Sequence, residues 1–192
     1  MIESREWLRA KLTRYGQHCQ NDPLQLEATN RIRTFVDQNE DCFCRSHLSG
    51  HVTGSAWIVN ETMEAALLVH HRKLGLWLQL GGHAEGDSHI LNVALREAQE
   101  ESGILALKVL SNDIFDVDVH LILARQSVPE HFHYDIRFLL QAPSDAALKI
   151  NPRESLALAW VPLEEIIQNP LYESVQRMAK KSKKLASSGF HS

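Results

Sequence analysis

The first forty residues show a helical pattern of apolar positions. Between residues 4 and 16, apolar side chains recur every three to four positions, which predicts an amphipathic helix. A second helix is predicted after Asp22, because Asp22 can cap it, Pro23 suits its first turn and Gln25 can complete a capping box. The apolar stripe of the first helix is Trp7, Leu8, Leu12 and Tyr15, and that of the second is Leu24, Ala28, Ile32 and Phe35.

From about residue 50 the pattern changes to short apolar runs with polar flanks, which is typical of strands. The predicted strands cover residues 55–59, 65–69, 76–80, 106–110, 115–123, 132–141 and 156–161. A helix is predicted from about Ser88 to Ser102, and Gly103 suits the left-handed turn that ends it. The last helix is predicted to open at Asn169 and Pro170, with an apolar side made of Leu171, Val175, Met178 and Leu185. This mixture of helices and strands predicts an α/β fold.

Composition narrows the class of protein. The chain has 192 residues, of which 44% are hydrophobic and 23% charged, as in ordinary globular proteins. Its net charge of -4 gives no strong nucleic-acid signal. No apolar run approaches the ~20 residues of a membrane helix, and the charged N-terminus lacks the apolar centre of a signal peptide. We therefore expect a cytoplasmic protein with no membrane partner.

The three cysteines are Cys19, Cys42 and Cys44. An odd number argues against a disulfide framework, and reduced thiols fit the cytosol. Cys42 and Cys44 could form half of a metal site, but the sequence has no second cysteine pair to complete a zinc cage. We expect all three to be structural thiols.

Three glutamates crowd the end of the helix predicted over residues 88–102. Glu97, Glu100 and Glu101 stand at i, i+3 and i+4, so they share one helix face and repel one another. They also lie near the C-terminal end of the helix, where the dipole disfavours negative charge. A hard divalent cation would offset both effects, because Mg²⁺ prefers carboxylate oxygens. The alternative is a solvated acidic face that Arg96 partly neutralises.

The surrounding residues favour the metal site, because residues 82–104 resemble the Nudix box. That pattern is Gly, five residues, Glu, seven residues, Arg-Glu, an apolar residue, any residue, Glu-Glu, any residue, Gly and an apolar residue. Gly82 starts it, and residues 96–104 (REAQEESGI) match its second half at every specified place. On this motif the chain is identified as a member of the Nudix hydrolase family, with the resemblance covering about residues 50–165.

One position departs from the pattern: Ser88 stands where the first glutamate of the box is expected. Nudix boxes often read Gly-Gly-x-x-Glu-x-Gly-Glu, whereas this chain has GGHAEGD over residues 81–87, as if one loop residue were missing. Asp87 would then take the place of that glutamate. The alternative role for Asp87 or Ser88 is to cap the following helix.

The resemblance implies an α/β/α sandwich built on a mixed sheet, with an N-terminal helical extension over residues 1–45 and a Nudix domain over residues 46–192. It also implies hydrolysis of a diphosphate linkage in a nucleoside diphosphate-linked small molecule, with Mg²⁺ or Mn²⁺. Glu97, Glu100, Glu101 and the Gly82 carbonyl would hold the metal, and one glutamate would orient or deprotonate the attacking water. Arg96 would brace the carboxylates. The substrate would contact Gly81, Gly82, His83 and Glu85 in the loop.

A second polar pattern lies downstream of the box. In HFHYDIRF, residues 131–138, the polar residues His131, His133, Asp135 and Arg137 alternate with apolar ones, so they share one side of a strand. Residues 116–121 repeat the alternation with Asp116, Asp118 and His120, and the two strands are expected to pair as a hairpin. We expect His133, Asp135 and Arg137 to contact substrate. The alternatives are a solvated sheet face and a zinc site made of His120, His131 and His133.

Trp77, the overall function and the N-terminal helical pair each allow two interpretations. Trp77 could stack on a base or belong to the core. The leading function is a metal-dependent hydrolase, and the alternative is a Nudix-like ligand-binding or regulatory module without turnover. The N-terminal helical pair needs a partner surface. We expect it to pack on the same chain, with a homodimer as the alternative.

Overall fold

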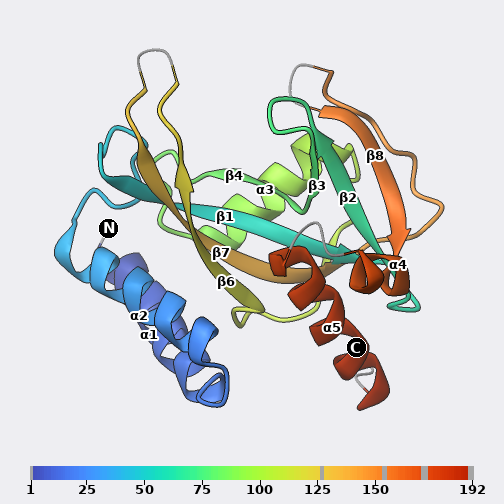
Figure 1. Cartoon of the computed structure of the whole chain (residues 1–192), viewed down its shortest axis with the longest axis horizontal. Coiled ribbons are helices and arrows are strands. Elements are labelled where there is room, and N and C mark those ends of the chain that lie inside the picture. Colours follow the sequence, from blue (N-terminus) through green and yellow to red (C-terminus); the bar gives the residue numbers. More distant parts are fainter. Residues whose placement is uncertain (1, 126–127, 153–154, 170–172, 190–192) are drawn as a thin grey trace. The chain divides into compact units, whose positions relative to one another are not determined.

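The computed structural model describes residues 2–125, 128–152, 155–169 and 173–189, which form two compact units (Figure 1). Unit 1 comprises residues 1–55, 82–94 and 112–138, and unit 2 comprises residues 56–81, 95–111 and 139–192. Four elements contribute residues to both units: β1 (Gly50–Val59), β4 (Leu80–His83), α3 (Ile90–Ser102) and β7 (His131–Gln141). No helix among the described residues is long and apolar enough to cross a membrane.

The N-terminal helical pair of unit 1 is confirmed as α1 (Ile2–His18) and α2 (Pro23–Gln38), which lie side by side (Figure 1). Asp22 caps α2 as expected, since its Oδ1 accepts a hydrogen bond from the Gln25 N–H at 3.1 Å. Helix α2 packs on β6 (Asp116–Ile122), so the pair packs on its own chain.

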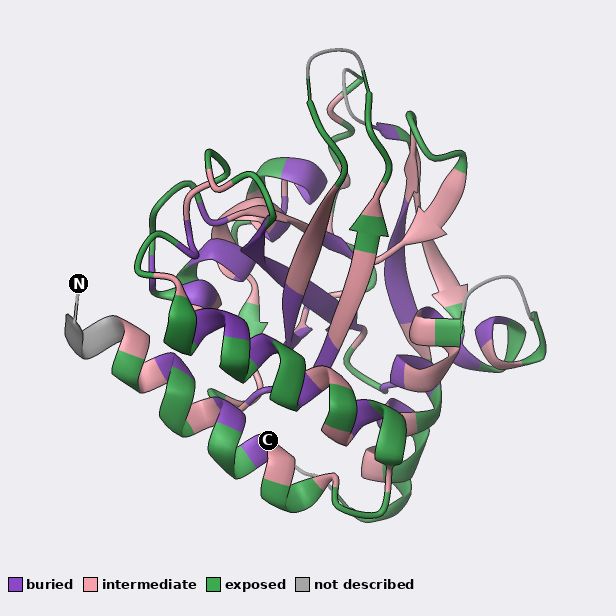
Figure 2. Cartoon of the chain, turned by 60° about the vertical axis from the view of Figure 1, so that its left-hand side comes forward, coloured by how far each residue is buried: buried purple, intermediate pink, exposed green. Residues whose placement is uncertain are grey.

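The buried face of α2 matches the expected stripe only in part. Ile32 and Phe35 are buried as expected, whereas Leu24 is 64% exposed and Gln25 and Thr29 are each 2% exposed. Figure 2 shows buried, intermediate and exposed residues along the N-terminal helices. The Gln25 amide does not complete a capping box. It donates to the Val117 carbonyl at 3.1 Å, and its oxygen accepts from the Tyr15 hydroxyl at 2.5 Å. The Gln25 side chain can therefore be buried, because Val117 and Tyr15 satisfy its hydrogen-bonding groups.

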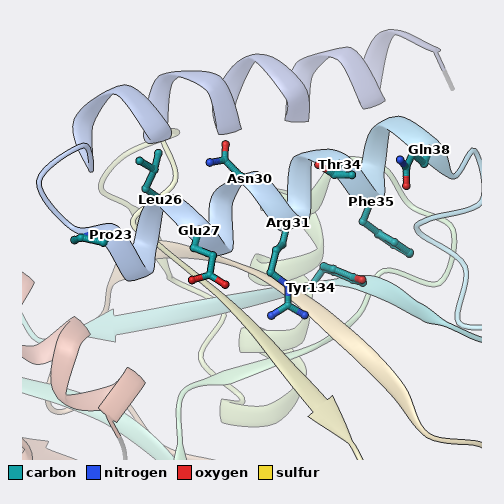
Figure 3. Close-up of a pocket in the computed structure, with 9 residues that line it drawn as sticks. All are labelled: Pro23, Leu26, Glu27, Asn30, Arg31, Thr34, Phe35, Gln38 and Tyr134. Carbon is teal, nitrogen blue, oxygen red and sulfur yellow. The ribbon is translucent and has the colours of Figure 1, made fainter.

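An open groove of 610 Å³ follows the other side of α2 (Figure 3). Phe35 and Tyr134 lie at one end of it, with stacked rings whose centroids are 4.0 Å apart. Tyr134 is on the apolar side of β7, as the alternation predicted. This stack joins α2 to β7 within unit 1.

The predicted hairpin is confirmed, because β6 and β7 pair antiparallel (Figure 1). The register sets Asp116 opposite Arg137 and Asp118 opposite Asp135, while His120 lies opposite His133. The two polar stripes therefore lie side by side on one face of this strand pair.

Unit 2 is built around a central strand, β2, whose whole length pairs with β8. The end of β1 and the short β3 pair with opposite ends of its other edge, and β5 pairs with the end of β7. Two helices, α4 and α5, pack together beside these strands (Figure 1). The bounds are β2 (Ala65–His71), β3 (Leu76–Leu78), β5 (Lys108–Val109), β8 (Ser155–Pro162), α4 (Leu163–Gln168) and α5 (Glu173–Ser187).

Several boundaries differ from the sequence prediction, including the start of β1 at Gly50 rather than residue 55. The run over residues 76–80 splits into β3 and β4, and β5 keeps only two of the five expected residues. Helix α3 begins at Ile90 rather than Ser88. The short α4 was not predicted, and Pro170 and Leu171, expected to open the last helix, lie outside the described residues. The α/β fold with an N-terminal helical pair is nevertheless confirmed.

Candidate active site

The glutamate face lies on the C-terminal half of α3, within unit 2. One guanidinium nitrogen of Arg96 is 2.7 Å from a Glu97 carboxylate oxygen and 3.5 Å from a Glu100 oxygen. The Glu97 side chain is 17% exposed, whereas that of Glu100 is 62% exposed. Arg96 therefore holds two carboxylates together and leaves one of them open to solvent.

Glu101 is anchored separately. It is 7% exposed, and its Oε2 accepts a hydrogen bond from the Gly81 backbone N–H at 2.9 Å. The structure thus brings together two predicted site residues that are 20 positions apart in the chain. Arg96 thus contacts two of the three carboxylates and the Gly81 N–H contacts the third, and the cluster offers the all-oxygen ligands that a hard cation prefers.

The loop after β4 belongs to unit 1 and carries Gly82, His83 and Glu85. Glu85 and Gly86 have positive φ angles of 51° and 87°, which produce a tight turn. The Gly86 N–H donates to the Phe43 carbonyl at 2.9 Å, and the exposed Glu85 carboxylate lies 3.3 Å from Arg45. The backbone of this loop is therefore held, while the Glu85 carboxylate stays accessible.

The missing glutamate of the box is not replaced by a buried carboxylate. Asp87 is exposed, and its Oδ1 accepts from the His89 N–H at 2.8 Å, just before α3 begins. Ser88 is 9% exposed. The observed contact of Asp87 is local, of the kind that organises a helix start.

Asp135 and Arg137 form an internal network within unit 1. The Arg137 side chain is 2% exposed and lies 2.7 Å from Asp135, 3.1 Å from Asp116 and 3.3 Å from Asp118. Burial opposes the charged guanidinium, but the three carboxylates outweigh it and raise the pKa of Arg137. The other Asp135 oxygen accepts from the Thr53 and Ser55 hydroxyls at 2.9 and 2.8 Å. These contacts face the protein interior, and substrate binding by Asp135 and Arg137 stays a prediction.

The structure brings His83 and His133 together, with ring centroids 5.2 Å apart. His51 joins them at 5.0 Å from His83 and 4.8 Å from His133. Burial and, after it, the neighbouring positive groups lower the pKa of His133 to about 2 and that of His51 to about 4. Both rings are therefore neutral at pH 7.

Sequence reasoning missed His51, Thr53 and Ser55. His51 and Thr53 lie on β1 before the start of the strand expected there, and Ser55 is the first residue of that expected strand. Their spacing of two residues was an available signal, since polar residues at i, i+2 and i+4 share one side of a strand.

A cavity of 530 Å³ lies within unit 2. Trp77 and His70 line it, with stacked rings whose centroids are 5.0 Å apart. Trp160 also lines it, and its buried indole N–H has no hydrogen-bond partner among the described residues. An aromatic wall with a free donor suits a planar ligand that carries an acceptor.

The cysteines fit structural roles. All three are free, and burial raises the pKa of the Cys42 thiol to about 12. The Cys42 thiol is therefore protonated at neutral pH, and the structural role expected of the three cysteines stays a prediction.

Comparison with known proteins identifies the family. The NUDIX domain model matches residues 50–184. Among solved structures, the Ap4A hydrolase binary complex of C. elegans is similar with a TM-score of 0.57 and 16% identity, over 71% of this chain and 98% of that one. The MutT NUDIX hydrolase from Burkholderia pseudomallei gives a TM-score of 0.54 and 20% identity, over 69% and 98%.

A third similar structure is the dihydroneopterin triphosphate pyrophosphohydrolase of E. coli, with a TM-score of 0.51 and 16% identity over 69% of this chain and 95% of that one. At these identities the likeness shows a shared fold. A comparison with curated proteins finds no match. The domain match spans more than half of the chain and contains the whole glutamate motif. The chain therefore belongs to the Nudix hydrolase family.

Proposed function

We propose that the chain is a metal-dependent pyrophosphohydrolase that cleaves a diphosphate linkage in a nucleoside diphosphate-linked substrate. The observation that carries the proposal is the carboxylate face of α3, where Arg96 bridges Glu97 and Glu100 while Glu101 is fixed to the Gly81 N–H. A face that repels itself in this way needs a cation, and the donor set suits Mg²⁺ or Mn²⁺.

Each residue then has a defined task. Glu97, Glu100 and Glu101, with the Gly82 carbonyl, would hold the metal. When bound, the ion would neutralise phosphate charge and lower the pKa of an attacking water. Glu100, the most exposed of the three carboxylates, is placed to orient that water or accept its proton. Arg96 holds the Glu97 and Glu100 carboxylates close to each other. Gly81, His83 and Glu85 would contact the phosphates of the substrate.

The names of the similar structures support the substrate class. An Ap4A hydrolase and a dihydroneopterin triphosphate pyrophosphohydrolase both act on phosphoanhydrides that carry a planar ring. We place the planar part of the substrate in the cavity beside Trp77. A screen of nucleotide sugars, dinucleotides, nucleoside triphosphates and ADP-ribose-type compounds with Mg²⁺ tests the proposal. Ligand binding without turnover across the whole screen would instead support a regulatory module.

Turnover is expected to require a divalent cation. Removing all divalent metal with EDTA should abolish hydrolysis, because the carboxylate face cannot neutralise an anionic substrate by itself. Adding excess Mg²⁺ or Mn²⁺ should restore the rate, as measured by chromatography of the two phosphate monoesters that cleavage of the diphosphate linkage produces. Full activity in metal-free buffer would eliminate the metal-hydrolase mechanism.

Asp87, rather than Ser88, is expected to do the work of the missing box glutamate. Asp87→Ala should lower kcat/KM more than Ser88→Ala, because only Asp87 supplies a carboxylate. Steady-state kinetics of both variants provide the measurement, and circular dichroism checks that α3 still forms. Small and equal losses of kcat/KM would mean that both residues act only in forming the start of α3.

We also propose that residues 1–45 form an extension to a Nudix domain of residues 46–192, in a cytoplasmic enzyme whose free cysteines stay reduced. Deleting residues 1–45 is expected to lower solubility, since it removes the helix that packs on β6 and the Gln25 contacts of Val117. Light scattering on the intact chain tests the alternative. A dimer that becomes a soluble, folded monomer after the deletion would make the extension an interface.

A further inference from the structure

Five histidine rings gather in unit 1, on four strands. Ring centroids lie 4.8 Å apart for His51 and His133, 5.1 Å for His51 and His131, and 5.2 Å for His131 and His133. His83 lies 5.0 Å from His51, and His120 lies 5.4 Å from His133. Such a cluster is costly if its members are protonated, because like charges this close repel strongly.

We propose that His51, His131 and His133 form a second metal site, separate in chemistry from the carboxylate face and selective for a borderline divalent ion such as Zn²⁺. One ring nitrogen from each of the three lies within 4.8 Å of the others. Nitrogens on a tetrahedral zinc ion are about 3.4 Å apart at Zn–N distances of about 2.1 Å. Small ring rotations therefore close the three around an ion.

Unsatisfied nitrogens point to a ligand. His51 is 3% exposed, and neither of its ring nitrogens finds a hydrogen-bond partner in the described part of the chain. The buried Nε2 of His133 is also without one. Buried polar atoms in native proteins are nearly always paired, and a coordinated ion would satisfy one nitrogen of each ring.

The third proposed ligand, His131, is oriented as a ligand requires. Its Nδ1 lies 2.9 Å from the Pro129 carbonyl oxygen, which can only accept, so Nδ1 carries the proton and Nε2 holds the free lone pair. Metal-binding histidines commonly donate their other N–H to a carbonyl or a carboxylate in this way.

A glycine brings the ligand-bearing strands together. The Phe132 N–H donates to the Ser49 carbonyl at 3.1 Å, beside Gly50. A Cβ at Gly50 would lie 2.4 Å from the Phe132 carbonyl oxygen, and its φ of 150° disfavours other residues. Only glycine allows this approach, which sets His51 next to His131 and His133.

The ligand chemistry selects the ion. Three imidazoles suit Zn²⁺ and its transition-metal neighbours, whereas Mg²⁺ prefers oxygen. Three protein ligands also leave a fourth position for water or an anionic oxygen, as in sites that interact with small molecules.

The test is zinc binding by the full chain, stripped with chelator and then titrated with Zn²⁺ in the presence of excess Mg²⁺. We expect one zinc per chain by elemental analysis after desalting, and binding at least ~100-fold weaker in His51→Gln. Gly50→Ala should also weaken binding, although it leaves every ligand in place. His18→Gln, at an exposed histidine of α1, is the matched control and should bind as the wild type does.

Two further measurements keep the result interpretable. In the wild type, zinc should shift the imidazole NMR signals of His51, His131 and His133, which does not depend on how any variant folds. The double variant Glu97→Gln and Glu100→Gln should keep its zinc. No uptake by the wild type, equal affinity in a folded His51→Gln, or loss of zinc in the double glutamate variant would each overturn the proposal.

Discussion

Replacing Arg137 with methionine is expected to lower the free energy of unfolding by about 3–5 kcal/mol, because it leaves two buried carboxylates without their cation. Asp116 and Asp135 are 0% and 2% exposed and both bond to the guanidinium. Without it, the two buried carboxylates repel each other and lose these hydrogen bonds, and urea unfolding at pH 7 measures the loss.

Arg33→Met is the control, since Arg33 is exposed on α2 and its replacement should change stability by about 0.5 kcal/mol or less. Arg137→Lys should give an intermediate loss, because an ammonium keeps the charge but not the planar set of donors. A loss below about 1 kcal/mol for Arg137→Met would contradict the view that the network is held by its central charge.

Glu100→Gln and Glu101→Gln are each expected to lower kcat by at least ~100-fold while the fold survives, as for the loss of one positioned catalytic group. Glu100 is exposed, so removing its charge relieves repulsion with Glu97 and should leave the metal-free melting temperature unchanged or higher. Glutamine at position 101 keeps an oxygen that can accept from the Gly81 N–H. Steady-state kinetics and thermal unfolding without metal supply both readouts.

Glu40→Gln removes an exposed carboxylate outside the box and should retain the wild-type rate. The Mg²⁺ concentration for half-maximal activity should rise in the two box variants only. Near-normal rates combined with a lower melting temperature would instead make the carboxylate face a structural feature of α3.

The site was predictable where local spacing decides the geometry. The i, i+3, i+4 positions of the glutamates place them on one face of α3 whatever the remaining fold does. In the same way, alternation along residues 131–138 and 116–121 was enough to place each polar stripe on one side of its strand, while the register that sets His120 opposite His133 comes from the structure.

What escaped prediction depends on distant partners. Gln25 is buried because Val117 satisfies its amide, so the first two turns of α2 bury Gln25 and Thr29 in place of Leu24 and Ala28. His51 belongs to a strand that begins where Ser49 bonds to Phe132. The alternation showed that Arg137 shares a side with Asp135, but the depth of their burial follows from the hydroxyls of Thr53 and Ser55. None of these three long-range contacts has a signature in the local sequence.

A long-range contact in unit 2 limits how early this unit can complete its folding during synthesis. Trp57 is 0% exposed, and its indole N–H donates to the Ser182 hydroxyl at 2.8 Å, across 125 positions of sequence. At about 5–20 residues per second, a ribosome needs roughly 6–25 s to add those residues. For that interval the Trp57 indole N–H lacks this acceptor. The nascent chain therefore carries the N–H without its final partner until α5 is made, and a chain that stops before Ser182 never supplies that partner.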